Sequence, residues 1–391
     1  MREKTEKKFG GQAGHKGETL KRADNPDEII EHHADKCSTC GASLAGIAVE
    51  EMVARQVIDI EIKKKVQEHR AFIKQCKCGA RNSRMPKHVT APVQYGPGVR
   101  ALSVYLSQQF VPKERTSEFF KEVCDIDISD TTLIAFDTEC AHNLTPLYDA
   151  TFTAIMQSEV VNFDETGLRV KGKTHWGHVS STEQFTHYRI TEKRGNIPQD
   201  FAGVAVHDHF VSYNKMSNAE HAYCNAHHLR ELRAVFEIDC EIWAHDMYNL
   251  LKYSSQLIEP TADQLNQISQ TYDCILDEGL ALHERPALRN LRYKKTSAHN
   301  LVIRLIKYKT ETLRFLYDSS VPFTNNLAER DLRMVKLKQK VSGGFRTEQG
   351  AHNFAITRSF ISTTRKQQKN VYASIKSALA DNISFDSFVY A

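Results

Sequence analysis

Two aspartates that each follow a predicted buried strand constrain the fold of this chain more than any other feature. Asp164 ends an apolar run at 159–164, and Asp208 follows a second apolar run at 203–206. Between them apolar and polar residues alternate as they do in strands. The predicted elements are a strand at 159–164, a hairpin at 168–180 around Lys171-Gly172-Lys173, a strand at 184–191, a short helix at 196–201 and a strand at 203–206. This β-β-β-α-β order predicts an α/β fold with a mixed sheet that carries both aspartates at strand ends.

A third carboxylate, Glu329, changes the interpretation of these aspartates. An acidic residue at the end of a strand is usually a turn or capping residue, so Asp164 or Asp208 alone indicates little. Glu329 lies on the first turns of a helix that begins near Asn325. Two strand-end aspartates and a helical glutamate supply the oxygen ligands that two Mg²⁺ or Mn²⁺ ions prefer. Two such ions, roughly 4 Å apart, promote in-line displacement at phosphorus, so the sequence predicts metal-dependent phosphoryl transfer.

Basic residues follow Glu329 on the same helical face. Arg333, Lys336 and Lys340 come four, seven and eleven residues later, a spacing that keeps them beside the glutamate. A basic stripe of this kind is suited to a nucleic-acid backbone. The alternative is a solvated helix face followed by a turn. Further predicted DNA contacts come from the loop and helix that follow: Gly343, Gly344, Arg346 and Arg358.

The net charge of +4 hides an uneven distribution along the 391 residues. Residues 1–100 carry +6, residues 101–320 carry −8, and residues 321–391 carry +6. Two basic ends favour a polyanionic partner, although an ordinary mixed surface is an alternative. No stretch is apolar enough to span a membrane or to act as a secretion signal. Five of the nine cysteines are scattered through the larger part of the chain, which is typical of a reducing compartment, so we expect a cytoplasmic protein.

Four of the cysteines form two close pairs on either side of a predicted hairpin at 57–76. Cys37 and Cys40 are separated by two residues, Cys76 and Cys78 by one, and a glycine follows each pair. Four thiolates in two pairs suit a tetrahedral structural Zn²⁺ ion. Because the second pair is C-x-C, a histidine is an alternative to one of the cysteine ligands, and the candidates are His69, His32 and His33. The alternative is that all four are free thiols.

The motifs resemble, in combination, those of one known family. They are GGQAGHKG at 10–17, the two cysteine pairs, FDET at 163–166, Asp208 followed by Tyr213, PFTNNLAERDLR at 322–333, QKVSGGFR at 339–346 and RSFISTTRKQ at 358–367. Together they resemble the insertion-sequence-66 (IS66) family of bacterial transposases over nearly the whole chain. The resemblance implies a ribonuclease-H-like core in which Asp164, Asp208 and Glu329 are the catalytic DDE triad, with a helical insertion before the glutamate. It also implies a zinc-binding domain that takes part in binding DNA ends.

Two features stay open. Cys224 and His227 form a C-x-x-H pair after Asp208, similar to one seen in several DDE transposase groups, and they serve either a structural or DNA-end role or packing alone. Helices at 99–110, 114–124 and 129–142, the last capped by Ser129, form either a helix-turn-helix or a plain helical bundle. The domains predicted are a flexible basic glycine-rich arm (1–25), a zinc-binding domain (26–92), a helical segment (93–157), a ribonuclease-H-like catalytic domain (158–360) with an insertion at about 219–320, and a C-terminal helical tail (361–391).

The function predicted is that of a DNA transposase. It binds the ends of an insertion sequence and uses two Mg²⁺ ions to cleave the DNA strand and join its 3′-OH to target DNA. The expected partners are double-stranded DNA, a second or further copies of the chain, and accessory proteins of the same element. One alternative is a nuclease of the same fold that does not join strands. Another is a non-catalytic DNA-binding remnant, because the family usually has a helical extension before GGQAGHKG, near which this chain begins.

Overall fold

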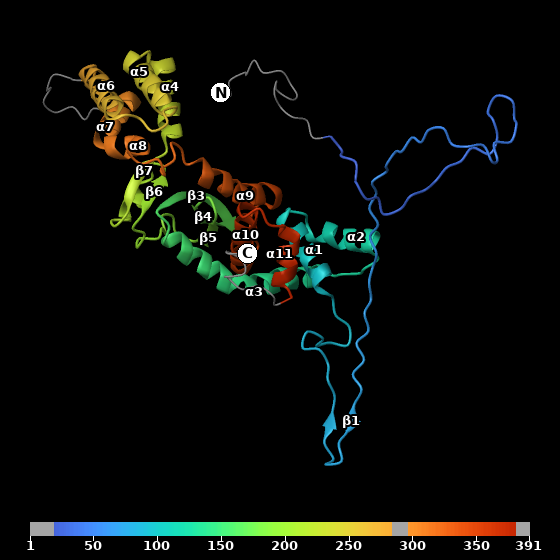
Figure 1. Ribbon diagram of the computed structural model, residues 1–391. Coiled ribbons are helices and arrows are strands. Elements are labelled where there is room, and N and C mark those ends of the chain that lie inside the picture. Colours follow the sequence, from blue (N-terminus) through green and yellow to red (C-terminus); the bar gives the residue numbers. More distant parts are fainter. Residues whose placement is uncertain (1–18, 284–295, 381–391) are drawn as a thin grey trace. The chain divides into compact units, whose positions relative to one another are not determined.

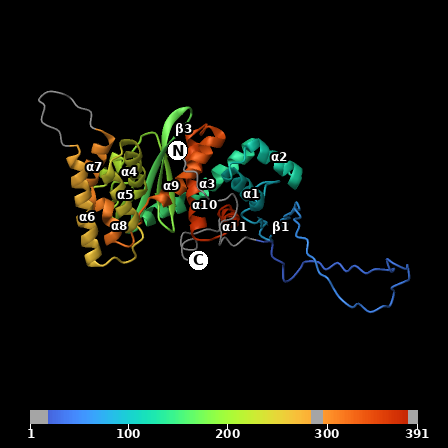
Figure 2. The same ribbon diagram turned by 90° about the horizontal axis from the view of Figure 1, so that it is seen from above.

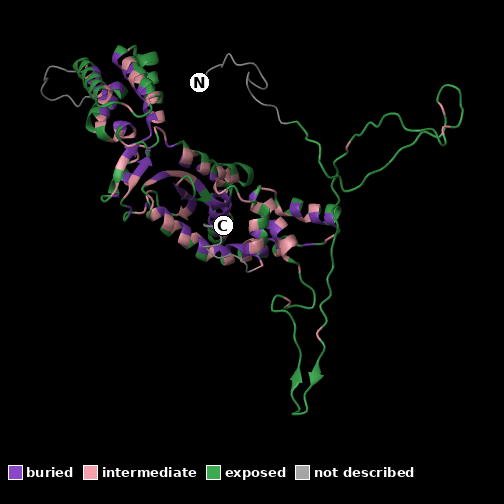
Figure 3. Ribbon diagram, in the orientation of Figure 1, coloured by how far each residue is buried: buried purple, intermediate pink, exposed green. Residues whose placement is uncertain are grey.

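The computed structural model describes residues 19–283 and 296–380, which belong to two units, Met1–Lys63 and Lys64–Ala391. The GGQAGHKG motif of the predicted arm lies outside the described residues. In the first unit, the described residues 19–63 form no helix or strand, and nearly all of them are exposed (Figure 3). Their main ordered feature is a bridge between Lys36 and Ser43, which closes the turn that holds Cys37.

The hairpin predicted at 57–76 is wrong in its position. Only β1 (Lys74–Gln75) and β2 (Arg81–Asn82) pair, and they lie beyond most of the alternating stretch. Ile58 and Ile60 are 59% and 80% exposed. Alternation predicts a strand only where one face is covered, and a two-stranded hairpin without a core to cover it is marginal in water.

The second unit is built around a five-stranded mixed sheet. Its strands are β3 (Val160–Val170), β4 (Lys173–Ser181), β5 (Thr186–Thr191), β6 (Val204–His207) and β7 (Glu220–Tyr223). They lie in the order β5-β4-β3-β6-β7, where β3, β4 and β5 are antiparallel and β6 and β7 run parallel to β3. The predicted mixed sheet is therefore confirmed. So is the predicted hairpin, whose two-residue turn places Lys171 and Gly172 at φ 49° and 73°.

Three details of the sheet differ from the prediction. β3 does not end at Asp164 but continues to Val170, because its residues 162–170 pair with the whole of β4. Residues 196–201 form no helix, since Pro198 lacks an N–H and keeps the preceding residue out of the helical region. β7 lies in a stretch that the sequence pattern predicts to be helical.

Helices make up most of the remaining described structure. They are α1 (Pro97–Gln108), α2 (Lys113–Cys124), α3 (Asp130–Met156), α4 (Asn225–Asp239), α5 (Ile242–Ser254), α6 (Ala262–Ala281), α7 (Ser297–Lys307), α8 (Lys309–Tyr317), α9 (Asn326–Ser342), α10 (Glu348–Lys366) and α11 (Val371–Ala378), with a 3-10 turn at Val211–Lys215. Ser129 caps α3 as predicted, but the helix runs well past residue 142. None of the described helices is both long and apolar enough to cross a membrane.

The helices cover the sheet in layers (Figures 1 and 2). One face packs against α9 and α10 through Leu168, Val179 and Tyr188, and the other packs against the end of α3 through Val161 and Phe163. At one end of the sheet, α1, α2, α3, α10 and α11 share a single apolar core. This packing agrees with the helical-bundle interpretation of the helices predicted at 99–110, 114–124 and 129–142. At the β7 edge, α4 to α8 enclose a separate core centred on Trp243 and Tyr272.

Candidate active site

The register of the parallel strands brings Asp164 and Asp208 to the same level of the sheet. β3 pairs with β6 as far as Asn162, which lies opposite Val206. Two residues further along each strand are Asp164 and Asp208. β7 ends at the same level, because His207 lies opposite Tyr223. Cys224, the residue after Tyr223, is therefore next to Asp208. The sequence prediction that folding brings the two aspartates to one edge of the parallel strands agrees with this register.

The charges of the three acidic residues interact in the folded chain. The pKa of Asp164 is raised to about 7, first by burial and then by the negative charges of Asp208 and Glu329. The backbone N–H of Glu165 donates to Asp164 Oδ1 at 2.8 Å, and Lys336 lies near enough to offset part of the increase. A bound cation would act in the opposite direction, because positive charge favours the ionised carboxylate.

The three carboxylates do not form a site for one shared ion. Within residues 19–283 and 296–380, the three metal-ligating groups that come within 4.8 Å of one another are those of Cys224, His227 and Glu329. Asp164, Asp208 and Glu329 are therefore spread more widely than one coordination sphere. This spread is compatible with two ions, because different carboxylates then bind different ions.

Asn325 fixes the helix that carries Glu329 against the strand that carries Asp164. Its side-chain amide donates to the carbonyl oxygen of Phe163 at 2.8 Å and accepts from the side chain of Asn162 at 2.9 Å. The backbone N–H of Asn325 donates to Cys224 Sγ at 3.1 Å. Asn325 is buried and does not use its side chain to cap α9. The start of α9 is thereby held between β3 and the end of β7.

Glu329 faces α4 as well as the aspartates. Its carboxylate lies 4.0 Å from the Cys224 thiol, which donates toward it, and 3.9 Å from the Arg230 guanidinium. Sequence reasoning missed the roles of Asn325 and Arg230 and left Cys224 and His227 open. The only available signal for Asn325 is the asparagine pair before the helix, which normally indicates a cap and not a side-chain bridge to a distant strand.

The predicted basic stripe lies on the outer face of α9. Arg333, Lys336 and Lys340 are exposed, whereas Ala328, Leu332 and Val335 pack on the sheet. Beyond the helix, Gly343 is its left-handed C-cap, and Arg346 is exposed.

Gly344 has a structural explanation that differs from phosphate binding. Its φ is 140°, and a Cβ atom there would lie 2.4 Å from the carbonyl oxygen of Arg169. The neighbouring Phe345 N–H donates to this same carbonyl at 2.8 Å, so the loop is joined to the end of β3. Close packing against β3 therefore requires a glycine at this position.

Arg358 does not reach the surface, so its predicted role as a DNA contact is wrong. It is 1% exposed, donates to the carbonyl oxygen of Gln108 and lies over the rings of Phe110 and Phe354. Burial lowers the pKa of its guanidinium to about 10. The cause is the position of α10, which is covered by the sheet, by α3 and by α1, so that even its polar residues are internal.

Each cysteine pair forms a tight local turn. Gly41 N–H donates to the carbonyl oxygen of Cys37 at 2.9 Å, and Gly79 N–H donates to that of Cys76 at 2.8 Å. Backbone hydrogen bonds from Cys40 and Thr39 lower the pKa of the Cys37 thiol to about 7. A lowered thiol pKa favours the thiolate that a metal binds. The two pairs belong to different units, and the structural Zn²⁺ ion on all four thiols stays a prediction.

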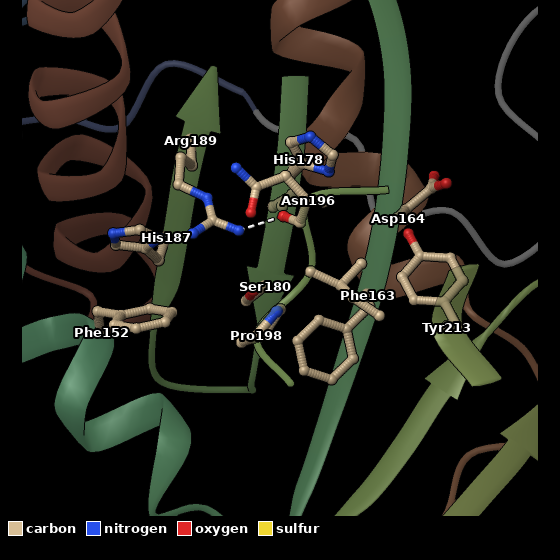
Figure 4. A pocket seen from close by; sticks show the side chains of 12 residues that line it. Phe152, Phe163, Asp164, His178, Ser180, His187, Arg189, Asn196, Pro198 and Tyr213 are labelled. Carbon is tan, nitrogen blue, oxygen red and sulfur yellow. Dashed lines mark hydrogen bonds between the residues drawn. The ribbon is translucent and has the colours of Figure 1, made fainter. Parts of the chain in front are cut away.

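A small cavity lies on the side of β3 away from α9. Its volume is about 10 Å³, room for roughly one water molecule. Its walls include Phe152, Phe163, His178, His187 and Tyr213. Figure 4 shows Asp164 at the margin of this group, with its carboxylate turned away from Phe152 and His187. The cavity is therefore part of the packing behind the strand and is too small for a substrate.

Residues 92–353 match the family model described as "Transposase IS66 family". Two curated relatives from Sinorhizobium fredii are similar to the chain. One, "Uncharacterized protein y4hP", is 25% identical over 351 residues, which cover 75% of this chain and 61% of that protein. The other, "Uncharacterized protein y4jD", is 22% identical over 402 residues, which cover 92% of this chain and 76% of that protein.

Proposed function

We propose, because this chain belongs to the IS66 family of transposases, that it binds the DNA ends of an insertion sequence and carries out both strand cleavage and strand transfer. The observation that carries the catalytic part is the register at the end of the parallel strands, where Asp164 and Asp208 lie at one level. The charges of both aspartates and of Glu329 interact there. This arrangement supports a DDE-type catalytic site.

We also propose that the sheet is of the ribonuclease-H-like class. In chain order, three antiparallel strands come first and two parallel strands follow, with the first strand in the centre. The aspartates lie on the first strand and directly after the fourth, and the glutamate lies on a helix after the α4 to α8 insertion. This distribution supports the class that the sequence motifs imply.

The donor set fits two Mg²⁺ or Mn²⁺ ions. Asp164, Asp208 and Glu329 offer only carboxylate oxygens for such ions. When no cation is bound, burial and the negative charges of Asp208 and Glu329 raise the pKa of Asp164. When bound, the ions activate the attacking oxygen and stabilise the leaving oxygen at the phosphorus. The chain itself would hold the carboxylates in place through Asn325 and direct the DNA backbone along Arg333, Lys336 and Lys340. The chain spans 61% of the length of its relative y4hP. The DNA and protein partners of a complete transposase therefore belong to this proposal.

A cleavage assay with Glu329→Gln tests the proposal. The substrate is duplex DNA that bears the ends of the insertion sequence encoding this chain, with Mg²⁺ present. We expect Glu329→Gln to lower cleavage by on the order of 100-fold or more, since a preorganised electrostatic group is removed from the reacting phosphate. Glu348→Gln is the matched control, because Glu348 also lies in the first turn of a helix but pairs with Lys171 at the surface.

Two results would contradict the proposal. Equal cleavage by Glu329→Gln and Glu348→Gln would remove Glu329 from the catalytic site. Cleaved ends that never join to a second duplex, in a reaction that contains wild-type protein and target DNA, would leave a nuclease without strand transfer.

A further inference from the structure

We propose that Cys224, His227 and Glu329 form a binding site for one thiophilic transition-metal ion of the Zn²⁺ class, separate in its chemistry from the carboxylate site with which it shares Glu329. Among the described residues, this group alone brings three metal-ligating side chains together, with the ligand atoms within 4.8 Å of one another. The site is assembled from the junction of β7 and α4 and from the first turn of α9, where Glu329 lies 105 residues beyond Cys224.

The distances are close to those of a bound ion. Zn²⁺ binds sulfur at about 2.3 Å and nitrogen or oxygen at about 2.0–2.2 Å, so ligand atoms of a tetrahedral site lie roughly 3.3–3.8 Å apart. Cys224 Sγ and Glu329 Oε1 are 4.0 Å apart before any ion is present. Because all three ligand atoms lie within 4.8 Å of one another, closing the site around an ion requires each of these distances to shorten by at most about 1.5 Å.

The backbone around the site is already fixed. Cys224 is the residue before α4, and His227 follows in its first turn, where its N–H donates to the Cys224 carbonyl oxygen at 3.1 Å. On the other side, the N–H of Asn325 holds Cys224 Sγ at 3.1 Å, and the N–H of Asn225 donates to the carbonyl oxygen of Phe323 at 3.2 Å. The two helix starts are therefore tied together around the three ligand atoms.

His227 provides an independent indication that a ligand is expected here. Its Nδ1 atom is shielded from solvent and has no hydrogen-bond partner within the part of the chain that the structure describes. A buried polar nitrogen without a hydrogen-bond partner destabilises a fold. A metal ion bound by Nδ1 would supply the missing partner.

The donor set selects the ion. A thiolate, an imidazole and a carboxylate suit Zn²⁺, whereas Mg²⁺ prefers oxygen ligands only. On coordination the Cys224 thiol releases its proton to solvent. Arg230, the present ion-pair partner of Glu329, has a side chain that is 65% exposed, so it can move into solvent when a cation takes its place.

The shared glutamate links this site to the carboxylate site. A carboxylate that is bound to Zn²⁺ beside Cys224 is withdrawn from Asp164 and Asp208. Zn²⁺ would therefore inhibit Mg²⁺-dependent cleavage, and this consequence rests on the proposed function. The binding site itself does not, because its evidence is the geometry of Cys224, His227 and Glu329 alone.

Binding of Co²⁺ by the full chain tests the site without any activity measurement. Co²⁺ substitutes for Zn²⁺ and gives a thiolate-to-metal absorption band. The stoichiometry of the metal-free chain reloaded with Co²⁺ is compared between wild type, Cys224→Ser and His227→Ala. Serine keeps an acceptor for the Asn325 N–H, and His227→Ala covers the case in which Cys224→Ser does not fold. Cys274→Ser is the matched control, since Cys274 is an exposed thiol on α6.

We expect wild type and Cys274→Ser to bind one more equivalent of Co²⁺ than Cys224→Ser and His227→Ala. Any ion on Cys37, Cys40, Cys76 and Cys78 contributes equally to all four proteins. Equal stoichiometry and equal absorption in all four would overturn the proposal.

In the cleavage assay, Zn²⁺ should inhibit wild type more strongly than Cys224→Ser. A wild-type chain that binds the additional Co²⁺ but never cleaves DNA would contradict the proposed function and leave the metal site intact.

Discussion

Individual residues decide whether the acidic side chains can act together, and Asn325 is the clearest case. It lies between the strand that carries Asp164 and the helix that carries Glu329, and its side chain contacts both Asn162 and the Phe163 carbonyl. Buried amides of this kind favour one arrangement of neighbouring elements, because any other leaves several polar groups unpaired. Asn325 thus acts as a positioning residue for the site.

Replacing Asn325 should destabilise the protein. We expect Asn325→Ala to lower the free energy of unfolding by about 2–4 kcal/mol, since it leaves the Asn162 amide and the Phe163 carbonyl without partners. The measurement is urea unfolding followed by circular dichroism. Asn326→Ala is the control, because Asn326 is the exposed next residue. Equal unfolding midpoints for the two variants would show that the bridge contributes nothing.

At the scale of the element, α9 has two faces with different tasks. Ala328, Leu332 and Val335 bury one face against the sheet, while Arg333, Lys336 and Lys340 leave the other basic and exposed. Glu329 lies at the start of this helix, so the basic face leads away from the acidic residues. A helix with this division can hold the catalytic carboxylate rigidly and still contact DNA.

The outer lysines of α9 should determine part of the salt dependence of DNA binding. We expect Lys336→Ala and Lys340→Ala to lower the slope of log affinity against log salt concentration by about 1 each, since each removes a phosphate contact. Fluorescence anisotropy with labelled duplex over a salt series measures the slope. Lys252→Ala on α5 should leave it unchanged. If the variant that carries both Lys336→Ala and Lys340→Ala has the wild-type slope, α9 does not contact the DNA backbone.

At the scale of the whole molecule, the fold buries histidines as neutral side chains. His178, His187, His207 and His228 are all less than 9% exposed. Burial lowers the pKa of His178 to about 4 and the pKa values of His187, His207 and His228 to about 3. In the unfolded chain, a histidine takes up a proton below about pH 6.5. The unfolded state therefore binds more protons, and stability falls as the pH drops from about 6.5 toward 3.

Acid should destabilise the protein through these histidines. Between pH 7 and pH 5.5 each one is expected to remove about 1 kcal/mol from the free energy of unfolding. Burial also raises the pKa values of the Asp164 and Asp137 carboxyl groups, and these two groups act in the opposite direction. Urea unfolding at constant ionic strength measures the change. His228→Gln should reduce it by about 1 kcal/mol and His32→Gln, at an exposed position, should not. Identical pH dependence in these two variants would contradict this explanation.

Much of the second unit follows from local patterns. Alternation and the Lys171-Gly172 turn predict the β3–β4 hairpin, and the cap at Ser129 marks the start of α3. Patterns fail where distant packing decides the outcome. The stretch at 57–73 lacks a covering layer and forms no strand. Arg358 looks like a surface cation until α10 is enclosed on several sides. β7 forms because β6 is beside it, and no feature of its four residues predicts that.

Residue types and their spacing already identify the chemical groups of the site: two aspartates after apolar strands, a glutamate on a basic helix, and a C-x-x-H pair. Residue type and spacing are local properties, so they can be recognised without a fold. The way in which these groups are shared between two sites depends on how distant segments pack. Strand register aligns Asp164 with Asp208, and Asn325 brings α9 to both β3 and Cys224, so that Glu329 lies between the aspartates and the cysteine–histidine pair. The physical reason is that such placement depends on backbone pairing and buried hydrogen bonds between segments more than 100 residues apart in sequence.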